Sequence, residues 1–248
     1  MKDIEYGRMF DVEDHHWWYR GMESITRAIL NRHLPPATGR QILDAGCGTG
    51  AAMANYLPEY GRVAGLDISP LALGFCRVRR LKRLAQASVM EIPFASGHFD
   101  IVASFDVMVL VDRDARTVEE FFRVLRPGGH LVLRVAAHDW LRGEHDITVR
   151  TAHRYTVREV ERLLCNAGFE VVHMTYANTL LFPLAAGKRL LERVWPPPND
   201  ASDLTFARGT FDGLFRRILA SEAPIASRTG LPFGLSVVAL ARKPAAVD

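Results

Sequence analysis

The residues best suited to chemistry are acids and glycines that follow two apolar segments. Residues 42–50 read Ile-Leu-Asp-Ala-Gly-Cys-Gly-Thr-Gly, so Asp44 is followed by three glycines at alternate positions. Glycine lets a backbone turn sharply and approach a ligand closely, because it has no Cβ atom. A second acid, Asp67, ends the next apolar segment, 23 residues after Asp44. A carboxylate placed there can accept hydrogen bonds from both hydroxyls of a ribose. The pattern therefore predicts a site for a cofactor that contains a nucleoside.

These residues need strands that bring them to one edge of a sheet. The segments predicted as strands are 41–44, 63–67, 87–90, 99–105, 130–136, 169–176 and 235–242. The segments predicted as helices are 12–34, 51–57, 69–84, 114–125 and 156–167. Strands that alternate with helices indicate a parallel sheet with helices on both faces. We therefore expect an α/β fold in which the glycine-rich turn joins the first strand to a helix.

Composition argues against several other classes of protein. The chain has 248 residues, of which 48% are hydrophobic and 24% charged, as in ordinary globular proteins. Its net charge of +3 is too small to indicate binding to nucleic acid. The three cysteines are widely spaced, which favours a reduced, cytoplasmic protein over a disulfide framework. We expect no metal ion, because the histidines fit no compact ligand motif, and neither a signal peptide nor a spanning membrane segment.

The glycines alone do not choose the cofactor, because Gly46-x-Gly48-x-x-Ala51 also fits the dinucleotide fingerprint. Three later segments favour another family, and they are Glu-Ile-Pro-Phe at 91–94, Gly-His-Phe-Asp-Ile-Val at 97–102 and Arg-Val-Leu-Arg-Pro-Gly-Gly at 123–129. With the Asp-x-Gly-x-Gly-x-Gly loop, their order and spacing resemble the class I S-adenosylmethionine-dependent methyltransferases. The resemblance covers about residues 40–176 and the final strand. It implies a doubly wound, mostly parallel sheet of seven strands (the Rossmann-like methyltransferase fold) and S-adenosylmethionine as the cofactor.

The resemblance also assigns roles to residues at matching positions. The residues implied to bind the cofactor are Tyr19, Arg20, Asp44, Gly46, Cys47, Gly48, Gly50, Asp67, Ile68, Ser88, Val89, Met90, Phe105 and Asp106. Asp44 and the loop glycines would face the methionine part, whereas Asp67 would hold the ribose and Ile68 would contact the adenine. Residues 88–90 would lie at the adenine edge and residues 105–106 near the sulfonium. Cys47, between two glycines, is expected to be a small packing residue.

Two departures from the family pattern bear on the site. Most relatives have Asp where this chain has Ser88, so the contact to the adenine edge is weaker or uses a hydroxyl. Relatives often have Glu-His where this chain has Val109-Leu110, and that change removes a polar group from the rim of the site.

The N-terminal segment resembles one branch of the same family, in which an aromatic helix closes over the cofactor. The segments shared with this branch are His-His-Trp-Trp-Tyr-Arg at 15–20, His-Asp at 145–146, Arg-Tyr-Thr at 154–156 and Leu-Pro-Phe-Gly-x-Ser at 231–236. Relatives usually have two arginines before the tyrosine, and His153 replaces the first of them here. The resemblance implies that Tyr19 and Arg20 contact the cofactor from this lid, with Arg20 as a partner for the methionine carboxylate.

Histidines are the candidates for a general base. Histidine suits the removal of a proton from an acceptor, because its pKa lies near neutrality. His145 follows the fifth predicted strand, in the loop region that faces the ligand edge of such sheets, and it is the first candidate for a catalytic residue. Asp146 would either orient His145 or tie this loop to Arg154. The weaker candidates are His15, His16, His138 and His153.

Residues 177–232 interrupt the alternation of strands and helices. Their apolar pieces exceed what a simple connection needs, so they would roof a pocket for an apolar acceptor, form the face of a homodimer, or complete the core as a helix pair. The single domain, 1–248, is therefore divided into a helical lid (1–36), a cofactor-binding core (37–176), a helical insertion that caps the substrate (177–232) and a final strand with its tail (233–248).

Three functions remain open from these patterns. The first is methyl transfer from S-adenosylmethionine to a small-molecule acceptor. An oxygen nucleophile is favoured over carbon or nitrogen, and the reaction would belong to secondary metabolism. The second is a cofactor-bound relative that promotes a reaction without methylation, such as a cyclisation, and the missing Glu-His motivates it. The third is a dinucleotide-dependent oxidoreductase, against which the Arg-Pro-Gly-Gly turn and the final strand argue.

Overall fold

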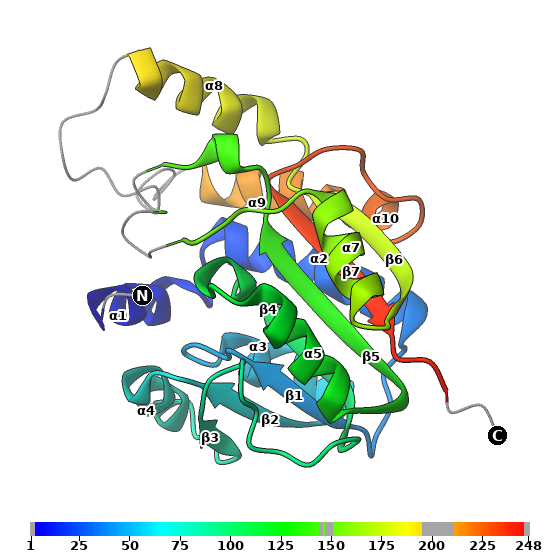
Figure 1. The fold of residues 1–248 in the computed structure, drawn as a ribbon. Helices are drawn as coiled ribbons and strands as arrows, with labels where there is room; N and C mark the ends of the chain where they lie inside the picture. Colours follow the sequence, from blue (N-terminus) through cyan, green and yellow to red (C-terminus); the bar gives the residue numbers. More distant parts are fainter. Residues whose placement is uncertain (1–2, 144–145, 147–150, 195–210, 246–248) are drawn as a thin grey trace.

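A seven-stranded sheet runs through the centre of the protein (Figure 1). The computed structural model describes residues 3–143, 146, 151–194 and 211–245. The strands are β1 (Gln41–Ala45), β2 (Arg62–Asp67), β3 (Leu84–Gln86), β4 (Phe99–Phe105), β5 (Leu125–Ala136), β6 (Glu170–Ala177) and β7 (Ser236–Arg242). Their order is β3-β2-β1-β4-β5-β7-β6. Only β7 runs antiparallel to its neighbours within this described sheet, so the predicted mostly parallel, doubly wound fold is confirmed.

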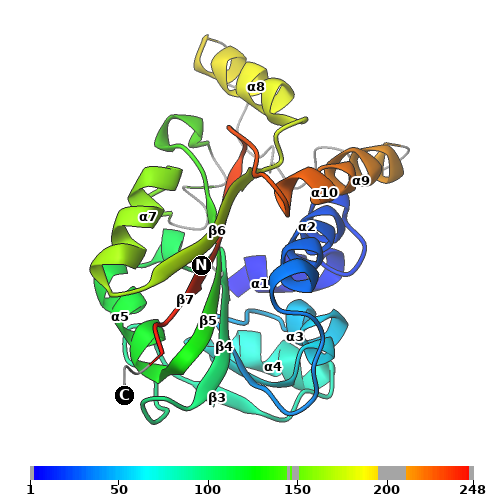
Figure 2. The same ribbon diagram turned by 90° about the vertical axis from the view of Figure 1, so that its right-hand side faces the viewer.

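Helices cover both faces of this sheet (Figure 2). The α-helices are α1 (Asp3–Val12), α2 (Trp17–His33), α3 (Ala51–Asn55), α4 (Pro70–Val78), α5 (Asp114–Val124), α7 (Val157–Asn166), α8 (Phe182–Val194), α9 (Asp212–Ser221) and α10 (Ala223–Ala226). The short 3-10 helices are η1 (Leu57–Glu59), η2 (Met108–Leu110) and η3 (Asp139–Leu141). Helices α5 and α7 lie on one face, and α2, α3 and α4 lie on the other, whereas α8 lies beyond the carboxyl ends of the parallel strands (Figures 1 and 2).

Each face of the sheet has its own apolar core. Phe121 of α5 and Leu164 of α7 are buried in the first core. Ile25 and Ile29 of α2 are buried in the second, against Val132 of β5. Their spacing of four residues places both isoleucines on one side of α2, which is why this helix lies against the sheet. Because burial of apolar surface stabilises by about 25 cal/mol per Å², these cores hold the strand ends in fixed positions.

The parallel register brings the ends of four strands to one edge of the sheet. Asp44 of β1 pairs with Gly65 of β2 and with Ala103 of β4. Phe105, the last residue of β4, pairs with Arg134 of β5. Residues that follow β1, β2 and β4 in the sequence therefore emerge side by side at this carboxyl edge.

Several elements differ from the sequence prediction. The helix expected over 12–34 begins only at Trp17, where His16 caps it: its Nδ1 accepts a hydrogen bond from the Trp18 N–H at 3.3 Å. Helix α1, before it, was not predicted. The helix expected over 69–84 ends at Val78, where Arg80 adopts a left-handed conformation with φ of 63°. The strand expected at 87–90 is therefore wrong by three residues, and β3 pairs with β2 through Leu84–Gln86 instead.

Two helices of the insertion, α9 and α10, pack on α2. Helix α9 lies along α2 (Figure 2). A Cβ atom at Gly21 of α2 would come within 2.6 Å of the Leu219 side chain, so glycine permits this close approach. None of the helices that the structure describes combines the length and the apolar character that crossing a bilayer requires.

Candidate functional site

A cavity of about 750 Å³ lies at the carboxyl edge of the sheet. Residues from the ends of β1, β2, β4 and β5, from α1 and α2, and from α8 line it. The predicted site residues that line it are Tyr19, Asp44, Gly46, Cys47, Gly48, Asp67, Ile68, Ser88, Val89, Met90, Phe105 and Asp106. Its volume is that of a typical site for a small ligand or cofactor. The fold thus gathers most of the predicted residues, which are far apart in the sequence, around one space.

The glycine-rich loop forms the floor of this cavity. The N–H groups of Gly46 and Cys47 both donate to the Leu66 carbonyl of β2, at 2.7 and 2.9 Å. Gly46 has φ of +81°, and a Cβ atom there would come within 2.1 Å of the Val107 side chain. A larger residue would therefore strain the backbone and push into the neighbouring turn. The loop keeps its shape because this position has no side chain.

Gly50 forms the turn that leads into α3, and it is not among the residues that line the cavity. It has φ of +89° and precedes the first residue of α3. A Cβ atom there would come within 2.7 Å of Leu81 and 2.9 Å of the Cys76 sulfur. The predicted contact between Gly50 and the cofactor is thus not supported by its position, because the residue faces α4 and the turn after it.

Asp67 lies beside the loop, as its place after a neighbouring parallel strand predicted. Its Oδ2 accepts a hydrogen bond from the Gly48 N–H at 2.9 Å, and its Oδ1 accepts one from the Ser69 N–H at 2.8 Å. Burial raises the pKa of Asp67, and these backbone hydrogen bonds limit the rise. A carboxylate has further lone pairs beyond these two bonds, so Asp67 can still accept hydrogen bonds from a ligand.

Asp44 is the most deeply buried acid of the cavity. Its side chain is 2% exposed, and its Oδ2 has no hydrogen-bond partner among the described residues. Burial, and then the charge of Asp67, raise the pKa of Asp44 to about 7. A buried acceptor without a partner is costly, and it implies a ligand that donates to it. A cationic ligand group would satisfy Asp44 best, because it would also offset the neighbouring negative charge.

The turn after β3 forms another wall of the cavity. The Ala87 N–H donates to the Asp67 carbonyl at 3.2 Å, which joins this turn to the end of β2. The Ser88 hydroxyl accepts a hydrogen bond from the Met90 N–H at 3.1 Å. Ile68, which is 65% exposed, lines the cavity on the same side. This wall offers an apolar surface with one hydroxyl, which suits a flat heterocycle.

Arg134 is a site residue that the sequence analysis missed. It lies in the inner strand β5, is 8% exposed and lines the cavity. Its Nε and Nη2 donate to Asp106 Oδ2 at 2.8 and 2.7 Å. The rings of Trp18 and Phe105 each lie 5.0 Å from its guanidinium carbon. The available signal was a charge inside the otherwise apolar run Leu-Val-Leu-Arg-Val at 131–135, because a buried charge needs a partner or a ligand.

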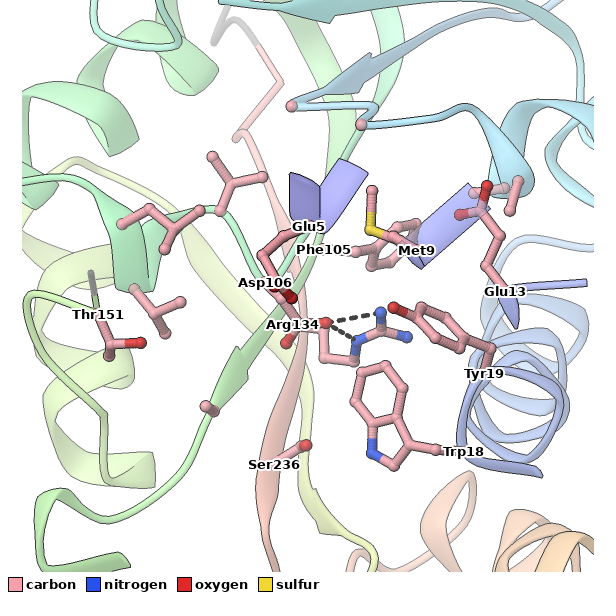
Figure 3. A pocket seen from close by; sticks show the side chains of 18 of the residues that line it. Glu5, Met9, Glu13, Trp18, Tyr19, Phe105, Asp106, Arg134, Thr151 and Ser236 are labelled. Atoms are coloured by element: carbon pink, nitrogen blue, oxygen red, sulfur yellow. Dashed lines mark hydrogen bonds and ion pairs between the residues drawn. The ribbon is translucent and has the colours of Figure 1, made fainter. Parts of the chain in front are cut away.

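The N-terminal helices close the cavity from the α2 side. Figure 3 shows Tyr19 pointing toward Arg134, with Met9 and Glu13 of the α1 region beside it. Burial raises the pKa of the Tyr19 phenol, so the hydroxyl stays protonated. Glu13, also missed, accepts hydrogen bonds from the Thr49 hydroxyl and from Arg79 at 2.8 Å. This carboxylate ties the junction of α1 and α2 to the glycine-rich loop and to α4.

Arg20 does not reach the cavity. Its Nη1 donates to Glu23 at 2.5 Å, and it lines a separate small hollow with residues of α9. The position of Arg20 therefore disagrees with its predicted contact to the cofactor. One residue corresponds to a rotation of about 100° around a helix, so Arg20 points away from the direction that Tyr19 takes.

His145, the predicted general base, lies outside the described residues. Its neighbour Asp146 is described, and it accepts hydrogen bonds from Arg154 Nε and Nη2 at 2.8 and 2.9 Å. Burial acts to raise the pKa of Asp146, but the bonds from Arg154 outweigh it and hold that pKa below its usual value. Of the two roles considered for Asp146, the tie to Arg154 is therefore the one observed.

Three of the other candidate histidines, His16, His153 and His138, have structural partners. His16 lines the cavity, but its Nδ1 caps α2. His153 Nδ1 lies 2.7 Å from Asp139. The His138 ring stacks on Tyr176 at 5.2 Å, and burial lowers its pKa. Within the described ranges, no three metal-binding side chains form a group that could hold a metal ion.

Comparison with known proteins decides the family. A model of the methyltransferase domain matches residues 43–133, which include the glycine-rich loop and Asp67. Residues 43–133 thus belong to the class I S-adenosylmethionine-dependent methyltransferase family. A probable S-adenosylmethionine-dependent methyltransferase from Mycolicibacterium smegmatis is 29% identical over 64% of this chain and 62% of the relative. An O-methyltransferase from Penicillium expansum is 28% identical over 62% of this chain and 60% of the relative.

A solved structure extends the likeness to nearly the whole fold. A chain in the complex between the Haloferax volcanii Trm112 methyltransferase activator and a putative methyltransferase has a TM-score of 0.65 and 20% identity. The match covers 99% of the present chain and 97% of the other. At that identity the likeness concerns the fold alone. This chain spans about three fifths of the length of the curated relatives described above.

S-Adenosylmethionine, the cofactor of the family, fits the residues present in the cavity. A Cβ atom at Gly46 would disturb the loop that forms the floor. Asp44 offers a buried oxygen without a partner, and Asp67 retains free lone pairs beside the loop. These features match the ammonium and the ribose hydroxyls of such a cofactor better than they match a nicotinamide. The dinucleotide hypothesis is therefore not retained.

Proposed function

We propose that this protein transfers the methyl group of S-adenosylmethionine to a small-molecule acceptor, with oxygen favoured as the nucleophile. The observation that carries the proposal is that the acid and glycine cradle shares one cavity with apolar side chains of α2, η2, α8 and α9, here called the apolar lobe. S-Adenosylmethionine, when bound, supplies an electrophilic methyl group. The protein then has to hold the nucleophile in line with that group and exclude water. The relative named as an O-methyltransferase supports oxygen.

The cradle is proposed to hold the cofactor by its polar parts. Asp67 would accept hydrogen bonds from the ribose hydroxyls while it keeps its bonds to the Gly48 and Ser69 N–H groups. Ile68 and the turn at 88–90 would enclose the adenine. Phe105 would lie near the sulfonium, where its ring adds an attractive surface for a positive charge. Cys47, which is 9% exposed, would pack under the loop.

The apolar lobe is proposed to hold the acceptor. It is lined by Trp17 of α2, Val109 of η2, Leu181, Leu184 of α8 and Phe215 of α9. Such a surface favours an acceptor with a sizeable apolar part, because apolar groups gain free energy when they leave water. Residues 1–36 would act as the lid and 177–232 as the cap. His145 stays the proposed general base, and its role rests on its place in the loop after the fifth predicted strand.

Binding and methyl transfer can be measured separately. Calorimetry should detect binding of S-adenosylmethionine to the wild-type chain at micromolar affinity. Incubation with methyl-labelled cofactor and a panel of apolar alcohols, phenols and carboxylic acids should then label an acceptor. Absence of cofactor binding would overturn the proposal. A converted substrate that carries no label would support the cyclisation alternative, which requires bound cofactor but no methyl transfer.

A further inference from the structure

Two buried groups of opposite charge face the cavity with open hydrogen-bonding atoms. Asp44 is 2% exposed and Arg134 is 8% exposed, and both line the same space. Asp44 Oδ2 has no hydrogen-bond partner among the described residues. The two residues belong to β1 and β5, which flank β4. Asp44 pairs with Ala103 of β4 and Arg134 pairs with Phe105, two residues further along that strand. Two strand spacings and two residues of rise place the backbones about 12 Å apart, and a small ligand can lie between the side chains.

Neighbouring side chains fix the direction in which Arg134 can donate. The ring centroids of Trp18 and Phe105 each lie 5.0 Å from the guanidinium carbon of Arg134. Asp106 Oδ2 accepts from Nε and Nη2 and so occupies one edge of the group. Nη1 has no acceptor among the described residues, and Figure 3 shows the guanidinium pointing toward Tyr19. The remaining edge can thus bind an anion in the plane of the guanidinium, as a carboxylate prefers.

The charges suit an α-amino acid better than a single anion. Arg134 acts on Asp44 electrostatically and lowers its pKa, against burial and the charge of Asp67, which raise it. A lone anion at Arg134 would lie close to Asp44 and be repelled by it. An α-amino-acid group instead presents an ammonium to Asp44 and a carboxylate to Arg134, so both charges are compensated.

We propose that Asp44 and Arg134 form a two-point clamp for the amino-acid end of the cofactor. Asp44 accepts hydrogen bonds from the ammonium, and Arg134 donates to the carboxylate. Asp106 is a positioning residue that orients Arg134. This inference rests on the proposed function, because it assumes that S-adenosylmethionine occupies the cavity. It replaces the role that the sequence suggested for Arg20.

Two ligands that differ only in the amino-acid end test the clamp. S-Adenosylhomocysteine carries that end, and methylthioadenosine has the same nucleoside without it. In calorimetry, Arg134→Gln should weaken binding of S-adenosylhomocysteine at least tenfold and change binding of methylthioadenosine less than twofold. Asp44→Asn should show the same selectivity. Arg134→Lys should lie between, because lysine keeps the charge but lacks the planar fork.

Matched variants separate binding from folding. Arg134→Gln leaves Asp106, whose side chain is 29% exposed, without its ion-pair partner, and that alone changes stability. The double variant with Asp106→Asn removes the unpaired charge, so the same selectivity should be measured on it. Arg20→Gln, on the same side of the fold but outside the cavity, should leave both affinities unchanged.

The possible results have different meanings. If the wild-type chain binds neither S-adenosylmethionine nor S-adenosylhomocysteine, the proposed function fails, and the clamp fails with it. If the wild-type chain binds both but the double variant weakens both test ligands equally, the cofactor assignment stands and the clamp is overturned. The clamp is also overturned if Arg134 variants leave both affinities unchanged and only raise KM for the acceptor.

Discussion

Lowering the pH should weaken cofactor binding through Asp44. Burial raises the pKa of Asp44 in the free protein to about 7. Pairing with an ammonium requires the ionised form, so the proton held below that pKa has to leave when the cofactor binds. The ionised fraction falls about tenfold from pH 8 to about pH 6 and a further tenfold per unit below that. The Kd for S-adenosylhomocysteine should therefore rise about tenfold over the first interval and stay constant above about pH 8.

Calorimetry can measure both the slope and the proton. Titrations at about pH 6 in two buffers that differ in ionisation enthalpy should report the release of about one proton per cofactor bound. Asp44→Asn should bind weakly at every pH and lose the slope. Methylthioadenosine, which has no ammonium, should bind the wild-type chain with the same affinity at pH 8 and pH 6.

Other charges near Asp44 need their own control. Asp67 and Arg134 face it, and Glu13 lines the same cavity with a pKa that burial also raises. Glu13→Gln should keep the slope if Asp44 is its source. A Kd for S-adenosylhomocysteine that is equal at pH 8 and pH 6, or an Asp44→Asn variant that retains the slope, would refute the reasoning.

Three further changes test the loop and its acids. Asp67→Ala should lower the affinity for S-adenosylmethionine more than tenfold in calorimetry. An unchanged affinity would exclude a role of Asp67 in ribose binding. Gly46→Ala should lower the free energy of unfolding in urea by about 2–4 kcal/mol, from a left-handed residue and overpacking, whereas Gly74→Ala, in an open place on α4, should not destabilise. Because the folded pKa of Asp44 lies above the ordinary value of 3.8, the ligand-free protein should lose stability from about pH 4 to about pH 7. At pH 8, Asp44→Asn should raise the free energy of unfolding by up to about 4 kcal/mol relative to the wild-type protein. Near pH 4 the variant should give no such gain. Equal stability of the variant and the wild type at pH 8 would contradict this.

The sequence sufficed for residues whose position follows from the ends of parallel strands. Asp44 and Asp67 follow two apolar segments, and β1 and β2 pair in parallel. Their carboxylates must then meet at one edge, whatever the loops between them do. The Gly48 N–H bond to Asp67 at 2.9 Å is the direct result. Such positions depend on strand order alone, which alternating strands and helices make predictable.

Residues whose position depends on register or helix rotation could not be predicted in the same way. Arg134 meets Asp106 because Phe105 pairs with Arg134 across β4 and β5. These residues are 28 apart in the sequence, and nothing in either segment reveals that register. Tyr19 and Arg20 are adjacent, but they point about 100° apart around α2. The motif therefore identified the helix and misplaced one of its two side chains.

The same limit explains why the insertion fitted several hypotheses at once. Phe215 and Leu219 are one turn apart on α9, and Trp17 and Gly21 are one turn apart on α2. Phe215 contacts Trp17 with ring centroids 5.5 Å apart, and both line the cavity. Leu219 lies on Gly21 and is fully buried in the core. Helix α9 thus lines the apolar lobe with Phe215 in its first turn and completes the core with Leu219, one turn later. Changes at Phe215 should therefore alter the choice of acceptor, whereas changes at Leu219 should alter stability first.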